Sequence, residues 1–290
     1  MAPTGYAKLH DVLREEVNRR LREVGVHPDK GLGQHFLVDD VALAQIVREA
    51  DLTNEDTVLE VGAGLGTLTE ALCRRAGKVI AYEPDGRMMA FLQSHLAPQF
   101  PNLELREKYI NRYEMDEVFA RFPAGGLKVV TNLPYGITHD FIVSIVGHIK
   151  LTADCVVMLQ HEVGKRLVAS PGSKAYGSLT VYTQTFAYAE ELMFVSREMF
   201  VPVPNVDSQL MRIRGLSRQP DLDDPGTYFR LVRGAFKHRR KTLSNALVLT
   251  FPHLNRTEIL RRLSHAELMP DRRGDTLTRE EFINLAREFA

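Results

Sequence analysis

The sequence lacks several features that would mark a metal-binding, disulfide-bonded or strongly charged protein. It has two cysteines in 290 residues, Cys73 and Cys155, far apart and without the spacing of metal ligands. We expect both to be reduced core residues of a cytoplasmic protein that binds no metal. Lysine plus arginine and aspartate plus glutamate each total 37, so the formal net charge is zero. No global field attracts nucleic acid, and any such attraction must come from a local patch.

Long apolar runs and repeats are also absent. No run is long enough to span a bilayer, and the N-terminus lacks the apolar region of a secretory signal. We therefore expect no membrane partner. Hydrophobic residues make up 44% of the chain and charged residues 26%, which is typical of a globular protein. The length suits one large domain with a smaller one.

Strands alternate with helices up to about residue 214, which predicts a mostly parallel sheet covered on both faces. The predicted strands are 57–61, 79–83, 103–105, 127–130, 155–159, 192–195 and 210–213. The predicted helices are 7–24, 39–50, 116–122 and 141–149, and a further helix or strand begins at 176–181. An acidic segment with prolines, 219–226, leads into a part with a helical pattern and no convincing strand.

A polar pair follows the strand predicted at 127–130. Asn132 and Tyr135 flank Pro134, which cannot donate to a sheet ladder and so ends the strand. They lie just beyond a strand's carboxyl end, where open α/β sheets bind ligands. An amide with donors and an acceptor, beside a flat ring, suits a planar base with an exocyclic amine. A polar strand-to-loop turn is the alternative.

A glycine-rich turn follows the strand predicted at 57–61. Its glycines, Gly62, Gly64 and Gly66, let a ligand approach the backbone closely. The spacing is G-x-G-x-G rather than that of a dinucleotide site, and the lysine of a P-loop is missing. The next strand ends at Glu83, where an acid can accept hydrogen bonds from a ribose. These features predict a nucleoside ligand without a pyrophosphate, such as S-adenosylmethionine; a solvated strand-end carboxylate is the alternative for Glu83.

Two further segments are compatible with ligand binding. Residues 30–37 combine two glycines with Gln34 and His35, which suits either a loop closing over a ligand or a plain loop. Residues 230–241 form the densest basic cluster in the chain. Cations on one short helix can neutralise phosphates, so this segment predicts a nucleic-acid face, with a solvated helix face as the alternative.

Taken together, the motifs resemble those of the ribosomal RNA adenine dimethyltransferase family, the KsgA/Dim1 group related to the Erm methylases. The resemblance runs from about Lys30 to Leu247. The matching motifs are Gly33-Gln34-His35-Phe36-Leu37, Glu60-Val61-Gly62-Ala63-Gly64-Leu65-Gly66, Glu83-x-Asp85, Asn132-Leu133-Pro134-Tyr135, Gln160-x-Glu162-x-x-x-Arg166, Tyr176-Gly177-Ser178-Leu179, Val201-Pro202-x-Pro204-x-Val206-Asp207-Ser208 and Arg233-x-Ala235-Phe236-x-x-Arg239-Arg240-Lys241-Thr242-Leu243.

The resemblance implies an α/β fold: a Rossmann-like class I methyltransferase sheet with an antiparallel final hairpin and a small all-helical C-terminal domain. The expected domains are an N-terminal helical extension (1–29), the methyltransferase domain (30–216) and a helical RNA-binding domain (217–290). The implied donor is S-adenosylmethionine, and the implied acceptors are two adjacent adenosines near the 3′ end of small-subunit rRNA. We expect a cytoplasmic monomer that acts on this rRNA or on a pre-30S-type particle.

The resemblance also implies roles for individual residues. Gln34, His35 and Leu37 would lie near the methyl end of the donor, and Glu83 would hold its ribose. The full donor-binding set carried over by position is Gln34, His35, Leu37, Gly62, Gly64, Glu83, Lys108 and Asn132.

On the acceptor side, the resemblance makes Asn132, Pro134 and Tyr135 the catalytic residues. Asn132 would accept a hydrogen bond from the target amine, with the carbonyl of Leu133 or Pro134 as a second acceptor. Tyr135 and Phe200 would stack on the adenine. The other implied RNA contacts are Arg233, Lys237, Arg239, Arg240 and Lys241.

Two positions differ from the family pattern. The family usually has an acid after the third strand that binds the donor's adenine amine. Here the best register places Lys108 there, with Glu107 one residue away. An ammonium group cannot accept a hydrogen bond from an amine. Gly136 follows Tyr135 where the family often has asparagine or a larger residue, which predicts a looser target pocket.

The implied chemistry needs no metal and no strong general base. Two acceptors aimed at the amine hydrogens would favour the pyramidal amine that attacks, and so stabilise the transition state rather than the substrate. Two other functions remain open: a methylase acting on large-subunit rRNA, and a non-enzymatic RNA-binding ribosome-assembly factor on the same fold. The basic C-terminal part favours the small-subunit enzyme, whereas Lys108 is compatible with the assembly factor.

Overall fold

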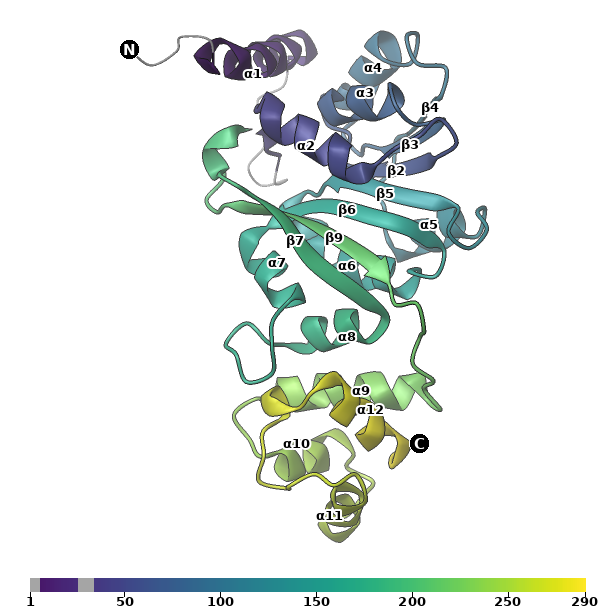
Figure 1. The fold of residues 1–290 in the computed structure, drawn as a ribbon, viewed down its shortest axis with the longest axis vertical. Helices are drawn as coiled ribbons and strands as arrows, with labels where there is room; N and C mark the ends of the chain where they lie inside the picture. The colour runs from purple at the N-terminus through teal and green to yellow at the C-terminus, as the bar shows by residue number, and fades with distance from the viewer. Residues whose placement is uncertain (1–5, 26–33) are drawn as a thin grey trace. The chain divides into compact units, whose positions relative to one another are not determined.

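The structure is a computed structural model that describes residues 6–25 and 34–290. The chain forms two compact units, each built from two stretches of sequence (Figure 1). The first comprises Met1–Gly164 and Glu190–Arg214, and the second comprises Lys165–Ala189 and Gly215–Ala290. This division differs from the boundary expected at residue 216, because 165–189 belongs with the helical unit.

A seven-stranded sheet has the order β4-β3-β2-β5-β6-β9-β7. Its strands are β2 (Thr57–Val61), β3 (Lys78–Tyr82), β4 (Leu103–Arg106), β5 (Leu127–Asn132), β6 (Thr152–Gln160), β7 (Ala187–Val195) and β9 (Ser208–Gly215). The five strands from β4 to β6 run parallel, and β9 pairs with β6 antiparallel. This confirms the expected mostly parallel sheet with an antiparallel end.

The helices of the first unit begin with α1 (Tyr6–Val24) and α2 (Asp40–Ala50), both predicted. The others are α3 (Thr67–Cys73), α4 (Gly86–His95), α5 (Arg112–Phe119), α6 (Thr138–Gly147) and α7 (His161–Leu167), the last of which ends in the second unit. Figure 1 shows α2, α3 and α4 on one side of the sheet and α6 on the other. Apolar residues of α2, α3 and α4 share one buried core with β2, β3 and β5.

Caps explain where several helices begin or end. The Asp39 side chain accepts a hydrogen bond from the Ala42 N–H at 2.8 Å and so caps the start of α2. The helix predicted at 116–122 is wrong in its bounds, because Asn111 caps α5 earlier by accepting from the Glu114 N–H at 3.0 Å. Gly25 ends α1 with φ of 65°, the left-handed conformation that favours glycine.

One sheet was not predicted. The two-residue strands β1 (Phe36–Leu37) and β8 (Phe200–Val201) pair antiparallel. This unit also contains two short 3₁₀ turns. The turn η2 spans Tyr135–Ile137, and η3 spans Arg197–Met199, directly before β8. The pairing brings the segment that begins at Gln34 beside a segment more than 160 residues later.

The second unit is helical. It contains α8 (Ser178–Phe186), α9 (Pro225–Lys237), α10 (Leu243–Thr250), α11 (Arg256–His265), the short turn η4 (Gly274–Thr276) and α12 (Arg279–Arg287). The segment at 176–181, predicted as helix or strand, leads into α8. Tyr176 and Val181 enter the same buried core as Tyr228, Leu231 and Phe282, which explains why 165–189 joins this unit.

Cys73 and Cys155 are both free and buried in the first unit. Within the parts of the chain that the structure describes, no helix is both long and apolar enough to cross a membrane.

Candidate active site

A cavity of about 420 Å³ opens at the carboxyl ends of β2, β3 and β5. After β2 the chain adds β3 and β4 on one side and then returns to place β5 on the other, so the strand order reverses beside β2. Ligands of open α/β sheets bind at such a point. The cavity volume also falls within the range of about 300–1,000 Å³ usual for small-molecule sites.

The Thr131 side chain on β5 bridges to β2 at this point. Backbone pairing between the two strands is recorded at Val58 and Leu59 only. Further along, the Thr131 hydroxyl donates to the Val61 carbonyl at 2.6 Å and accepts from the Val61 N–H at 3.3 Å. A side chain thus replaces the backbone ladder where the strands diverge to form the cavity.

The glycine-rich turn brings two sequence motifs into contact. Gly62 has φ of 81°, and a Cβ there would lie 3.0 Å from the Pro134 ring. Gly64 has φ of 56°, and a Cβ there would lie 3.0 Å from the Phe36 ring. Both positions therefore require glycine for their conformation and for close packing. The predicted approach of a ligand to this backbone is compatible with the cavity, which both glycines line.

Glu83 lies at the end of β3 and is 5% exposed. One carboxylate oxygen accepts from the Gly64 N–H and the other from the Asp85 N–H, both at 2.8 Å. Burial raises the pKa of Glu83, although the two backbone hydrogen bonds oppose this effect. The carboxylate is fixed in orientation, and it retains lone pairs for a hydroxyl-bearing ligand.

A second buried acid, Glu60 on β2, also lines the cavity and is 1% exposed. One of its oxygens has no hydrogen-bond partner among the described residues. Burial raises the pKa of Glu60 to about 8, and the negative charge of Glu83 adds to this shift. Burial in this site therefore favours the protonated form of Glu60. Sequence reasoning gave it no role of its own, although an acid inside a buried strand was a usable signal.

Asn132, Pro134 and Tyr135 reach the cavity together, as the sequence predicted for a strand end. The Asn132 amide makes no hydrogen bond with another described residue, so its donors and acceptor are available. The Pro134 carbonyl accepts from the Ile137 N–H at 3.2 Å and from the Thr138 hydroxyl at 3.5 Å, both long contacts. The Tyr135 hydroxyl lies 2.9 Å from the Ser208 hydroxyl, which fixes the ring.

Gln34, His35 and Leu37 line the same cavity. The amide of Gln34 lies 3.5 Å from a carboxylate oxygen of Asp85. The His35 ring packs 5.4 Å from the Tyr135 ring, and its Nδ1 lies 2.7 Å from the Pro202 carbonyl. The β1–β8 pairing thus carries this motif to the cavity. Residues 30–33 of the predicted loop lie outside the described residues.

Lys108 lines the cavity, but its ammonium group pairs with Glu114 at 3.0 Å. This contact raises the pKa of Lys108. Glu114 is 9% exposed, and its second oxygen is buried without a partner among the described residues. Glu107 is exposed and does not line the cavity. The position predicted for an acceptor of the donor's adenine therefore holds a cation that a neighbouring acid neutralises.

The structure shows the surroundings of two residues of the predicted acceptor pocket, Phe200 and Gly136. Phe200 lines the cavity but is only 1% exposed, so its ring belongs to the buried wall rather than to an open surface. Gly136 is exposed, and a Cβ there would meet no atom within 4 Å. Whether the target pocket is looser for this reason stays a prediction.

The predicted RNA-contacting cations lie in the second unit, on and just after α9. Arg233, Lys237, Arg240 and Lys241 are exposed, and none forms an ion pair with a described residue. Arg239 differs, because its guanidinium donates to Asp275 at 2.9 Å and to the carbonyls of Ser173 and Lys174. Arg239 therefore holds parts of the helical unit together.

Comparisons with known proteins identify the family of this chain. Residues 27–289 match the family described as ribosomal RNA adenine dimethylase. A relative from Geobacillus sp. (strain WCH70), named ribosomal RNA small subunit methyltransferase A, is 39% identical over 271 residues, covering 92% of this chain and 93% of the relative. The protein of the same name from Geobacillus kaustophilus (strain HTA426) is 40% identical over 275 residues, covering 93% and 94%.

Two solved structures are similar over most of the chain. A dimethyladenosine transferase from Plasmodium falciparum has a TM-score of 0.72 and 26% identity, covering 88% of this chain and 97% of that one. The 23S rRNA methyltransferase ErmE has a TM-score of 0.61 and 26% identity, covering 87% and 98%. By sequence and by fold, this chain belongs to the ribosomal RNA adenine dimethylase family.

Proposed function

We propose that this protein transfers methyl groups from S-adenosylmethionine to the exocyclic amines of two adjacent adenosines near the 3′ end of small-subunit rRNA, two to each amine. The observation that carries the proposal is the single cavity lined by a strand-end acid, Glu83, and by the Asn132–Tyr135 segment. The small subunit is favoured because relatives about 40% identical bear the name ribosomal RNA small subunit methyltransferase A.

The residues present suit the proposed donor. Glu83 has lone pairs for the ribose hydroxyls, and the backbone of Gly62 and Gly64 faces the cavity without side chains. Gln34, His35 and Leu37 would lie near the methionine and methyl end. The donor supplies an electrophilic methyl group when bound. In its protonated form, which burial favours, the Glu60 carboxyl beside this space would donate one hydrogen bond.

The acceptor side depends on hydrogen-bond acceptors and on a flat ring. An adenine amine is a weak nucleophile because its lone pair is delocalised into the ring. The Asn132 carbonyl, with that of Leu133 or Pro134, would accept the amine hydrogens and favour the pyramidal geometry that attacks. Tyr135 would stack on a base that has left its helix, and positioning would supply much of the rate.

The helical unit supports RNA binding through the exposed cations Arg233, Lys237, Arg240 and Lys241. Such groups neutralise phosphates and release counterions without reading sequence. We propose that residues 217–290 contribute the main RNA-binding surface and that residues 30–216 contain the methyltransferase site. The partner would be small-subunit rRNA or a pre-30S-type particle, approached by a monomer in the cytoplasm.

Titration of S-adenosylmethionine into the full chain, followed by calorimetry, tests the donor. We expect the natural sequence to bind, because the carboxyl of Glu114 neutralises Lys108 at the cavity. Lys108→Asp and Lys108→Met should be titrated beside it; only the first adds an acceptor. Binding by Lys108→Asp alone would mean that Lys108 disables the donor site, and would favour the RNA-binding assembly factor.

Mapping the methylated nucleotides tests the acceptor. Ribosomal RNA from both subunits is incubated with the protein and labelled donor, and the modified positions are identified. Dimethylation of two neighbouring adenosines in small-subunit rRNA is expected. Modification confined to large-subunit rRNA would instead support the function of the 23S rRNA methyltransferase to which the fold is also similar.

A further inference from the structure

Arg20 on α1 is an unusual residue because it is an arginine in the core of the first unit. Its side chain is 9% exposed, whereas that of the neighbouring Arg19 is 49% exposed. A buried guanidinium is costly unless its charge is paired and its donors are used. The elements around Arg20 satisfy both conditions.

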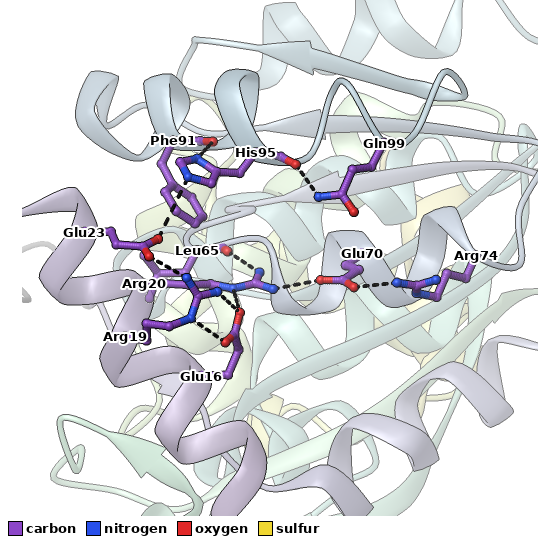
Figure 2. A network of polar contacts seen from close by, with 10 residues as sticks. All are labelled: Glu16, Arg19, Arg20, Glu23, Leu65, Glu70, Arg74, Phe91, His95 and Gln99. Atoms are coloured by element: carbon purple, nitrogen blue, oxygen red, sulfur yellow. Dashed lines mark hydrogen bonds and ion pairs between the residues drawn. The ribbon is translucent and has the colours of Figure 1, made fainter.

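Each nitrogen of the Arg20 guanidinium donates to a different partner (Figure 2). Its Nε donates to Glu16 on the same helix at 2.7 Å, and its Nη2 donates to Glu70 on α3 at 2.8 Å. Its Nη1 donates to the backbone carbonyl of Leu65 at 2.9 Å. Two carboxylates neutralise the charge, and the third contact reaches the backbone of the glycine-rich turn.

The Leu65 carbonyl depends on this contact. No backbone N–H among the described residues donates to it, and a buried carbonyl needs a partner. Leu65 stands between Gly64 and Gly66, whose φ angles of 56° and 79° place both in the left-handed region. Glycines do not hold such a conformation by themselves, because they have many alternatives.

The α1 helix holds Leu65 in a second way. The Leu65 side chain is 1% exposed and packs in a small core with Leu13, Val17 and Leu21 of α1. Carbonyl and side chain are therefore both fixed by the same helix. The polar contact comes from Arg20 alone, so it can be removed without touching the apolar contact.

The turn connects Arg20 to the cavity. Gly64, next to Leu65, donates its N–H to Glu83 at 2.8 Å, and Gly64 and Glu83 both line the cavity. If the Leu65 carbonyl lost its donor, the peptide groups on either side could rotate. The Gly64 N–H would then no longer hold the Glu83 carboxylate in one orientation.

We propose that Arg20 is a positioning residue: it fixes the glycine-rich turn in the conformation that binds the methyl donor, and so couples docking of the N-terminal helix to donor affinity. This inference rests on the proposed function, since it concerns the donor of that same site. Arg20 touches neither the donor nor the target base, so its effect should fall on donor binding rather than on methyl transfer.

Arg19 offers a matched control. It lies on the same helix and binds the same Glu16 at 2.6 Å, and it also pairs with Glu23 at 2.5 Å. It makes no contact with the turn among the described residues. Arg19→Met and Arg20→Met remove the same charge from the same helix, and only the second removes the donor of the Leu65 carbonyl.

The test is titration of S-adenosylmethionine into the full-length natural protein, Arg19→Met and Arg20→Met, with kcat and KM for the donor measured on rRNA. We expect Arg20→Met to raise the Kd and the KM for the donor by about 10-fold, near the lower limit for the loss of a hydrogen bond from a charged group. The kcat at saturating donor should stay within about twofold, and Arg19→Met should resemble the natural protein.

Arg20→Lys keeps the positive charge with a point-like ammonium and serves if Arg20→Met does not fold. It can satisfy the carboxylates or the carbonyl but not all three partners, so an intermediate loss of affinity is expected. Equal donor affinity in the natural protein and the Arg20 variants would overturn the inference, as would equal losses in the Arg19 and Arg20 variants. Absence of binding by the natural protein would instead defeat the proposed function itself.

Discussion

The cavity of the first unit and the basic segment of the second use charge in opposite ways. In the cavity, Glu60 and Glu83 are 1% and 5% exposed, and backbone N–H groups hold both oxygens of Glu83. On and after α9, Arg233, Lys237 and Lys241 are exposed and form no ion pair with a described residue.

The difference matches two kinds of recognition. Buried and hydrogen-bonded groups keep one geometry, which suits a single small ligand and a reaction that depends on position. Exposed cations on flexible stems keep many geometries, which suits a phosphate backbone that varies along its length. A substitution in one region should therefore leave the other function nearly intact.

The largest expected effect is in the cavity. Asn132→Ala removes an acceptor proposed to act in the transition state, and we expect methyl transfer to fall by at least about 10²–10³-fold, the loss typical of one preorganised hydrogen-bonding group. Affinity for rRNA should change little. Single-turnover methylation together with RNA binding measures both quantities.

Asn54→Ala is the matched control, because Asn54 is an exposed asparagine near the amino end of β2, away from the cavity. It should methylate at the natural rate. If Asn132→Ala retained that rate as well, the catalytic role assigned to Asn132 would be wrong.

An effect of intermediate size is expected in the basic segment. Replacing Arg233, Lys237 and Lys241 together by glutamine should weaken RNA binding by about 10–100-fold at low salt. It should also reduce the slope of log K against log salt by about 2, at about 0.7 per phosphate contact on single strands. Donor affinity should not change. Filter binding across a salt series, with calorimetry for the donor, separates the two effects.

A control with the same loss of charge lies in the same unit. Arg256, Arg261 and Arg287 are exposed, and each is hydrogen-bonded to a neighbour on the helical unit. Their replacement by glutamine should reduce RNA affinity far less. Equal losses in the two triple variants would show that net charge, rather than the segment at α9, determines RNA binding.

The last expected effect concerns stability rather than activity, and it is modest within any one pH unit. Burial raises the pKa of Glu60 to about 8 from an ordinary value of 4.5, so the folded protein holds a proton that the unfolded chain releases. Its stabilising contribution is complete below pH 4.5 and is lost as the pH rises through 8. Relative to Glu60→Gln, the natural protein should lose about 1.4 kcal/mol of unfolding free energy per pH unit between these values.

Urea unfolding of both proteins at several pH values measures this difference. Parallel curves for the natural protein and Glu60→Gln would mean that Glu60 takes up no extra proton on folding. In that case the carboxyl of Glu60 would not be uncharged in the folded protein.

The sequence predicted those parts of the site that depend on neighbours along the chain. The glycine-rich turn, Glu83 and the Asn132–Tyr135 segment each follow a strand with a clear apolar pattern, and parallel strands bring their carboxyl ends together. Their meeting in one cavity therefore follows from topology. The alternation of elements likewise predicted the parallel sheet.

The sequence did not predict contacts between distant segments. The strands β1 and β8 have two residues each, too few to show any period, yet their pairing brings Gln34 and His35 to the cavity. The neutralisation of Lys108 by Glu114 depends on where α5 begins. Arg239 pairs with Asp275 inside the helical unit, and the sequence of residues 230–241 alone gives no sign of this ion pair.

The interleaving of the two units has a practical consequence for making the protein in pieces. Neither unit is one continuous stretch, because 165–189 belongs to the second unit while 190–214 returns to the first. A fragment cut at residue 216 would carry Tyr176 and Val181 away from the core they share with Tyr228 and Phe282. During synthesis, α8 leaves the ribosome before α9 and α12, so it cannot pack against them until they have been made. Shorter versions for crystallisation or binding assays should therefore keep residues 165–189 together with the helical unit and residues 190–214 together with the first unit.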